Sequence, residues 1–90
     1  MTDLEDDVIR VINGLHAGEV ATYGELVEEA GHPGAARAVG NILAKSSGLP
    51  WWRVVGSGGR LKTGKSGRQA ELLRNEGLVV EAGRVVSGNR

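Results

Sequence analysis

Residues 59–66, GRLKTGKS, match the G-x-x-x-x-G-K-S pattern of a phosphate-binding loop. In nucleotide hydrolases that loop follows a buried strand of a parallel sheet, and an acid on a neighbouring strand helps to hold Mg²⁺. The stretch from Ser66 to residue 90 is too short to build such a sheet. We therefore interpret Lys62 and Lys65 as loop charges near phosphate groups and do not expect nucleotide hydrolysis.

Both tryptophans of the 90-residue chain stand side by side, as Trp51 and Trp52, between a proline and an arginine. Adjacent side chains of an extended segment point to opposite sides, so we expect at most one of the two in the core. Either one tryptophan is buried and its neighbour is a partly exposed bystander, or the segment forms a binding surface. The pair alone leaves both interpretations open.

The chain contains no cysteine, which excludes disulfides, thiolate metal sites and cysteine nucleophiles. Its two histidines, His16 and His32, fall in turn-like stretches without a His or carboxylate neighbour at ligand spacing. We expect both to be surface or packing residues. No metal or other cofactor is predicted.

Helix starts are predicted by three T/S-x-x-E/Q patterns, which pair Thr2 with Glu5, Thr22 with Glu25, and Ser66 with Gln69. Together with hydrophobic residues at helical spacing, these patterns predict helices over about residues 3–14, 23–30 and 67–76. Gly77 is the expected C-cap of the last of these helices. A further helix is expected over about residues 34–45, so that two helices form a helix-turn-helix around the breaker GHPG.

Short strands complete the expected fold. One strand is predicted around residues 53–55, and the tail LVVEAGRVV predicts a hairpin that turns at Ala82 and Gly83. We expect residues 1–90 to form one small domain, because this length allows a single modest core. The predicted fold class is mainly α with short β hairpins, resembling a winged helix-turn-helix.

Charge is segregated along the chain, although its formal net charge is zero. Residues 1–30 hold eight acids and one base, whereas residues 31–90 hold ten bases and three acids. Basic side chains gain affinity by releasing counterions from phosphate, so the second part predicts a surface for a polyanion. The alternative is that the two parts pair with each other.

The chain shows no secretory signal and no apolar run of membrane-spanning length. We therefore expect a cytoplasmic protein without a membrane partner. It is expected to be a monomer and to associate with the nucleoid when bound to DNA.

Three segments, YGELVEEAGHPGAARAVGNIL, PWWRVV and LLRNEG, follow one another in this order along the chain. Together they resemble the DNA-binding domain of O6-alkylguanine-DNA alkyltransferases, whose pattern is roughly TYG…G.P.AARAVG…PCHRVV…LL..EG. The resemblance covers about residues 8–78 and implies the architecture of the alkyltransferase C-terminal domain. In the family pattern a reactive Cys stands at the position of Trp51, and a His stands at the position of Trp52.

Alkyl transfer needs a thiolate activated by a neighbouring base, and both are missing at these positions. The chain is therefore not expected to be an enzyme, and it resembles the alkyltransferase-like proteins, in which Trp replaces the Cys. That resemblance implies binding of double-stranded DNA with O6-alkylguanine, flipping of the damaged base without removal of the alkyl group, and flagging of the lesion for nucleotide excision repair proteins. The alternatives are a helix-turn-helix regulator that reads DNA sequence, a protein-interaction module or a nucleotide-binding protein.

The resemblance also implies roles for single residues. Arg37 would enter the duplex in place of the flipped guanine, and Tyr23 would push on the neighbouring phosphate. Since the family helix around Arg37 docks in the minor groove, the implied DNA contacts are Tyr23, Ala35, Ala36, Arg37, Gly40, Lys62 and Lys65. The implied alkylguanine pocket consists of Tyr23, Leu43, Trp51, Trp52, Arg53, Val54, Val55 and Ser57.

Trp52 departs even from the alkyltransferase-like proteins, which usually keep the His. An indole offers only an N–H donor, so we expect Trp52 to donate to Glu76 and to support Trp51; the counterpart of Glu76 orients the His in the enzymes. The loop over residues 44–49 is shorter than in the enzymes, with Ser46 near an expected hinge Asn. The size of the pocket is therefore expected to differ from that of relatives.

Overall fold

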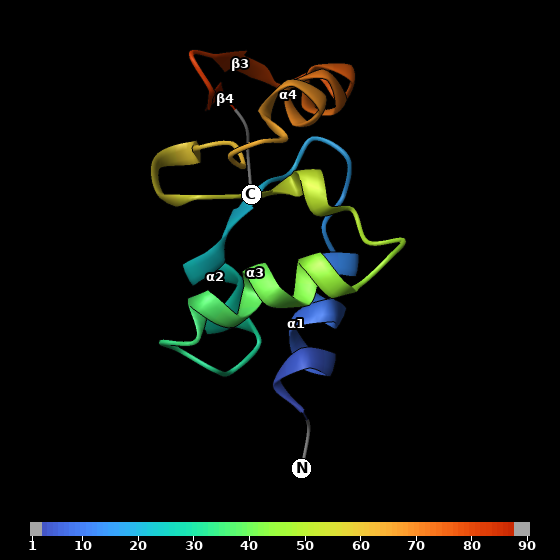
Figure 1. Cartoon of the computed structure of the whole chain (residues 1–90), viewed down its shortest axis with the longest axis vertical. Helices are drawn as coiled ribbons and strands as arrows, with labels where there is room; N and C mark the ends of the chain where they lie inside the picture. The colour runs from blue at the N-terminus through green and yellow to red at the C-terminus, as the bar shows by residue number, and fades with distance from the viewer. Residues whose placement is uncertain (1–2, 88–90) are drawn as a thin grey trace.

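The structure, a computed structural model, describes residues 3–87, apart from the side chain of Ser87. The chain is elongated, with extents of 40 × 23 × 21 Å. Figure 1 shows its two parts along the long axis, with α1, α2 and α3 in one part and α4 with the β3–β4 hairpin in the other. Within the described residues, no helix is long and apolar enough to cross a membrane.

Helices form where they are predicted, within a few residues at each end. They are α1 (Leu4–Asn13), α2 (Tyr23–Glu29), α3 (Ala36–Lys45) and α4 (Ser66–Asn75). Two short 3-10 turns, η1 (Trp51–Arg53) and η2 (Ser57–Gly59), lie between α3 and α4. The mainly helical fold class is therefore confirmed.

The helix caps follow the predictions only in part. At α1 the N-cap is Asp3, whose side chain accepts the Glu5 N–H at 3.1 Å; Thr2, the predicted cap, lies outside the described residues. At α2 the predicted capping box is confirmed, because Thr22 Oγ1 accepts the Glu25 N–H and Glu25 Oε1 accepts the Thr22 N–H. Both helix starts thus satisfy amides that have no partner within the helix.

The capping box predicted for α4 is wrong, and the C-cap of this helix is Glu76, one residue before the predicted Gly77. α4 begins without a side-chain cap, because the side chain of Gln69 is fully buried and bonds elsewhere. At the other end Gly77 has a φ of 90°, and the Leu78 N–H donates to the Leu73 carbonyl at 3.1 Å. This left-handed glycine ends the helix as a Schellman motif does.

Two short strand pairs complete the fold. The hairpin of β3 (Val79–Glu81) and β4 (Arg84–Ser87) turns at Ala82 and Gly83, as predicted, with φ angles of 54° and 74°. The other pair was not predicted: β1 (Ala21–Thr22) lies parallel to β2 (Val54–Val55), with Ala21 opposite Val54 and Thr22 opposite Val55. Arg53 belongs to η1, so the strand expected over residues 53–55 is shorter than predicted.

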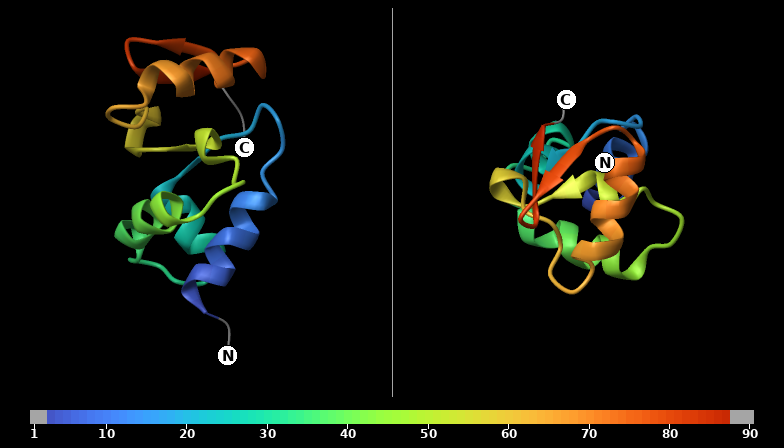
Figure 2. Two further views of the ribbon diagram at one scale, coloured as in Figure 1. Left: turned by 45° about the vertical axis from the view of Figure 1, so that its right-hand side comes forward. Right: turned by 90° about the horizontal axis from the view of Figure 1, so that it is seen from above.

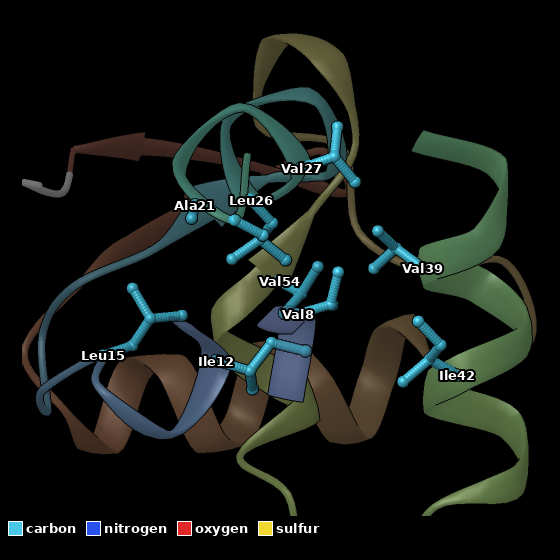
Figure 3. Packing of buried hydrophobic residues seen from close by; sticks show 10 residues of the cluster. Val8, Ile12, Leu15, Ala21, Leu26, Val27, Val39, Ile42 and Val54 are labelled. Carbon is cyan, nitrogen blue, oxygen red and sulfur yellow. The ribbon is translucent and has the colours of Figure 1, made fainter. Parts of the chain in front are cut away.

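The core consists of two clusters of buried side chains. The first cluster, shown in part in Figure 3, comprises Val8, Ile12, Leu15, Ala21, Leu26, Val27, Ala30, Val39, Ile42 and Val54. The second cluster comprises Ala70, Leu73, Leu78 and Val80. Val54 belongs to the first cluster and Trp52 packs against the second, so residues 51–55 connect the two parts of the molecule (Figure 2).

Candidate nucleic-acid interface

Tyr23 begins α2 next to the segment that carries the tryptophans. Because Thr22 is paired with Val55 in the β1–β2 pair, the first turn of α2 lies beside the strand that follows η1. Tyr23 is half-buried and packs against the first cluster. The parallel strand pair therefore brings Tyr23 close to Val54 and Val55, which were predicted to share a pocket with it.

Arg37 is exposed near the start of α3. The helix buries Val39 and Ile42 in the first cluster, while Ala35, Ala36 and Leu43 are half-buried at its border. Within residues 3–87, Arg37 forms no ion pair. Its guanidinium is thus available to a partner outside the chain.

Gly40 lies in the middle of α3, and no contact within the protein requires a glycine there. A Cβ built at this position meets no atom within 4 Å, and glycine is a poor residue for a helix interior. Leu43, one turn further along, is half-buried against the first cluster. The surface of α3 therefore stays small at Gly40 although the fold would accept a larger side chain.

Trp51 and Trp52 do not lie on an extended strand, contrary to the expectation, because η1 turns the chain there. Both side chains are half-buried, and their rings meet edge to face with centroids 6.3 Å apart and an interplanar angle of 88°. Trp52 packs against the second cluster, whereas Trp51 is part of neither cluster. The two tryptophans therefore differ in that Trp52 packs against a core cluster and Trp51 does not.

The predicted hydrogen bond between Trp52 and Glu76 is confirmed, with Nε1 donating to Oε2 at 2.7 Å. Glu76 also accepts from the Gly18 N–H at 2.8 Å and pairs with Arg53, whose Nη2 lies 2.8 Å from Oε2. Arg53 Nη1 in turn donates to the Leu15 carbonyl at 3.1 Å. These five residues, Leu15, Gly18, Trp52, Arg53 and Glu76, form the Glu76 network, which ties η1 to the end of α4 and to the loop after α1.

The protonation of Glu76 is set by this network. Burial alone would raise the pKa of its carboxyl. Hydrogen bonds from Arg53, the Gly18 amide and Trp52, together with the charge of Arg53, outweigh burial and lower the pKa from its ordinary value of 4.5. Glu76 is therefore a carboxylate at neutral pH and accepts hydrogen bonds from three residues at once.

Gln69 supports the same segment from the other side, a role that the sequence did not indicate. Its Nε2 donates to the carbonyls of Trp52 and Val54 at 3.1 and 2.9 Å, and its Oε1 accepts the Lys62 N–H at 2.7 Å. The buried amide is thus hydrogen-bonded at both its oxygen and its nitrogen. It joins α4 to the backbone of η1 and β2 and to the basic loop.

The basic loop over residues 62–65 reaches the tryptophans. Lys65 Nζ lies 5.4 Å from the centroid of the Trp51 ring, within the range of a cation–π contact. Lys62 is half-buried and Lys65 is exposed, and neither forms an ion pair within the described residues. The loop charges therefore border the segment that was predicted to form the pocket.

Ser57 is exposed in η2, a turn that packs on the hairpin. Gly59 permits this packing, because a Cβ there would come within 2.7 Å of the Val85 carbonyl oxygen. A cavity of about 220 Å³ lies beside the turn, lined by Val20, Thr22, Glu25, Val55, Gly58, Gly59, Val85 and Val86. It shares Val55 with the predicted alkylguanine pocket but does not include Trp51.

Among the described residues, Lys45 and His32 contact acidic side chains of the acidic part of the chain. Lys45 Nζ lies 2.6 Å from Glu5 Oε1, and the hydrogen bond that Lys45 donates to Glu5 raises the pKa of Lys45. His32 Nε2 lies 2.8 Å from the buried carboxylate of Asp7. The alternative that the two parts pair with each other therefore holds for residues on α1, but not for Arg37 or the basic loop.

Both histidines have a carboxylate partner that the sequence interpretation missed. His16 Nδ1 lies 3.0 Å from Glu19 Oε1 on the surface, and His32 meets Asp7 across 25 residues of sequence. Within the described residues, no group of three or more His, Asp or Glu side chains is arranged to hold a metal ion. The Asp7 carboxylate also pairs with Arg10, whose Nη2 lies 2.8 Å from Oδ1.

Known proteins that act on DNA are similar to this chain in sequence. A DNA base-flipping protein of Vibrio parahaemolyticus is 42% identical over 84 residues, which cover 87% of this chain and 84% of that protein. A methylated-DNA–protein-cysteine methyltransferase of Shigella flexneri is 38% identical over 85 residues, which cover 88% of this chain and 49% of that enzyme. The chain thus spans about half the length of this methyltransferase.

A solved structure with the same fold contains damaged DNA. The crystal structure of S. pombe Atl1 in complex with DNA containing O6-carboxymethylguanine matches with a TM-score of 0.79 and 28% identity, over 87% of this chain and 79% of that chain. The family model of the DNA-binding domain of 6-O-methylguanine DNA methyltransferase matches residues 3–78. The chain therefore belongs to the family of this DNA-binding domain.

Proposed function

We propose that the protein binds double-stranded DNA containing O6-alkylguanine and flips the damaged base out of the duplex without transferring its alkyl group. The observation that carries this proposal is Trp51, which stands in the PWWRVV segment of a chain without cysteine. An indole offers an apolar surface and no nucleophile, so it can contact an alkyl group but cannot accept it.

The placement of the other side chains supports the same function. Exposed Arg37 is free of ion pairs within the described residues, as a finger that enters the duplex must be. Tyr23 lies beside β2 through the β1–β2 pair, and Lys65 lies over the Trp51 ring. A flipped base would then lie between α2, η1 and the basic loop, while α3 contacts the groove.

The deciding experiment compares two duplexes of the same sequence, one of which contains a single O6-methylguanine, by titration at fixed salt. We expect tighter binding of the modified duplex and an unchanged protein mass afterwards. Equal affinities would contradict damage recognition, and a mass increase of one methyl group would contradict the absence of alkyl transfer. A preference for a particular unmodified sequence would instead favour a helix-turn-helix regulator.

We further propose that the bound lesion is passed to nucleotide excision repair proteins, because a protein that cannot remove the alkyl group must leave its removal to others. The measurement is incision of the modified duplex by purified excision-repair proteins with and without this protein. Faster incision with wild type but not with Arg37→Ala is the expected result. Equal incision in all three reactions would contradict the transfer.

A further inference from the structure

Trp52 is fixed in place from three sides. Its Nε1 donates to Glu76 at 2.7 Å, the Arg53 guanidinium carbon lies 5.3 Å from its ring centroid, and the ring packs against the second cluster. Glu76 is itself held by Gly18 and Arg53. The Trp52 ring therefore has a defined orientation before any ligand binds.

Trp51 has weaker support of its own. It is part of neither core cluster, and its ring meets the Trp52 ring edge to face and the Lys65 ammonium. The Lys65 side chain is exposed, and cation–π contacts at exposed sites are weak. Trp52, which is itself held in place, is therefore a neighbour that can fix the orientation of the Trp51 ring.

We propose that Trp52 is a positioning residue that orients Trp51 and thereby sets the discrimination between alkylated and unmodified guanine. This inference rests on the proposed function, in which Trp51 is the wall that meets the alkyl group. Phosphate contacts and the entry of Arg37 do not depend on the alkyl group. A change at Trp52 should therefore alter the ratio of the two affinities more than the affinity for unmodified DNA.

Two substitutions separate the N–H donor of Trp52 from its packing area. Trp52→Phe keeps a large apolar ring but has no donor for Glu76, whereas Trp52→His keeps a ring N–H and buries less apolar surface. If Trp52 only packs, both melting temperature and selectivity should be better preserved by Phe. If its hydrogen bond orients Trp51, selectivity should be better preserved by His although Phe is the more stable variant.

The experiment titrates the two duplexes that differ by one O6-methylguanine with wild type and both variants, and melts the same samples. We expect the ratio of affinities to fall about tenfold in Trp52→Phe, because a Trp51 ring that is no longer held in one orientation meets the alkyl group less well, and to fall less in Trp52→His. An unchanged ratio in Trp52→Phe, or selectivity that follows the melting temperatures, would overturn the positioning role.

A second variant and a spectroscopic measurement test the proposal if Trp52→Phe does not fold. Glu76→Gln weakens the acceptor of the Trp52 hydrogen bond and keeps both tryptophans. An unchanged ratio of the two affinities in Glu76→Gln would overturn the proposal. Fluorine NMR of fluorotryptophan-labelled free protein should show one sharp Trp51 resonance in wild type and a broadened one once the Trp52 donor is removed. A wild-type protein without preference for the modified duplex would contradict the proposed function, whereas the NMR result tests the orientation of Trp51 independently.

Discussion

Gly40 gives the sharpest test of which surface meets DNA, because stability and binding should change in opposite directions. A Cβ at Gly40 meets no atom within 4 Å, so alanine fits without strain. Replacing glycine by alanine in a helix interior stabilises by about 0.5–1 kcal/mol. For a domain of this size each kcal/mol raises the melting temperature by roughly 4–8 °C, so Gly40→Ala should melt measurably higher than wild type.

Binding of the modified duplex should weaken at the same position. If α3 docks closely in a groove, as proposed, a side chain at position 40 holds the backbone away from the DNA. We expect a small loss of affinity in Gly40→Ala and a loss of at least about tenfold, or ~1.4 kcal/mol, in Gly40→Leu. The assay is titration of the duplex with O6-methylguanine at fixed salt, since phosphate contacts make affinity salt-dependent.

Ala44 provides the matched control. It is exposed on α3 one turn after Gly40, and Ala44→Gly makes the reverse change. The double variant Gly40→Ala/Ala44→Gly should return to about the stability of wild type while it keeps the methyl group at position 40. Unchanged affinity in Gly40→Leu would refute the assignment of this face of α3 to DNA.

Three further predictions follow from single contacts. Arg37→Ala should weaken binding of the modified duplex by about 1–3 kcal/mol without a change in melting temperature, because the side chain is exposed and makes no ion pair within the described residues. The lowered pKa of Glu76 contributes stability that is complete above the ordinary value and is lost as the pH falls through the lowered one. Urea unfolding should therefore show a larger acid loss of stability in wild type than in Glu76→Gln. Asp7→Ala should cost about 1–3 kcal/mol in the same assay, because it leaves the half-buried His32 without its carboxylate.

The helices were predictable because their signals are local. The capping box at Thr22, the hydrophobic spacing along α1 and α3 and the glycine after α4 act within one or two turns of chain. The β1–β2 pair could not be predicted in the same way. Each strand has two residues, too few for an alternating pattern, and their pairing joins segments that are far apart in the sequence.

Gln69 shows how a correct local pattern can mislead. Ser66 and Gln69 have the spacing of a capping box, but Gln69 is drawn into the interior because three backbone groups of η1, β2 and the basic loop need partners there. A buried polar group without a partner costs more than a missing helix cap contributes. The non-local hydrogen bonds therefore override the local one.

The residues named for DNA contact and for the pocket came from the family resemblance, and the structure adds how they are supported. The strand pair places Thr22, the residue before Tyr23, opposite Val55, and Lys65 reaches Trp51 through the basic loop. The sequence did not point to Gly18, because a backbone amide has no distinctive pattern, and it pointed to Gln69 only as part of a capping box. Their role depends on the position of a distant carboxylate or carbonyl.

Replacing the His of the family pattern by Trp52 has a consequence for pH. A His side chain gains or loses one ring proton near neutral pH, whereas an indole N–H does neither. Arg53 stays charged throughout that range, and the pKa of Glu76 is lowered away from it. The Glu76 network therefore keeps one protonation state across neutral pH, and the support that it gives to Trp51 should stay constant where a network built on His would change.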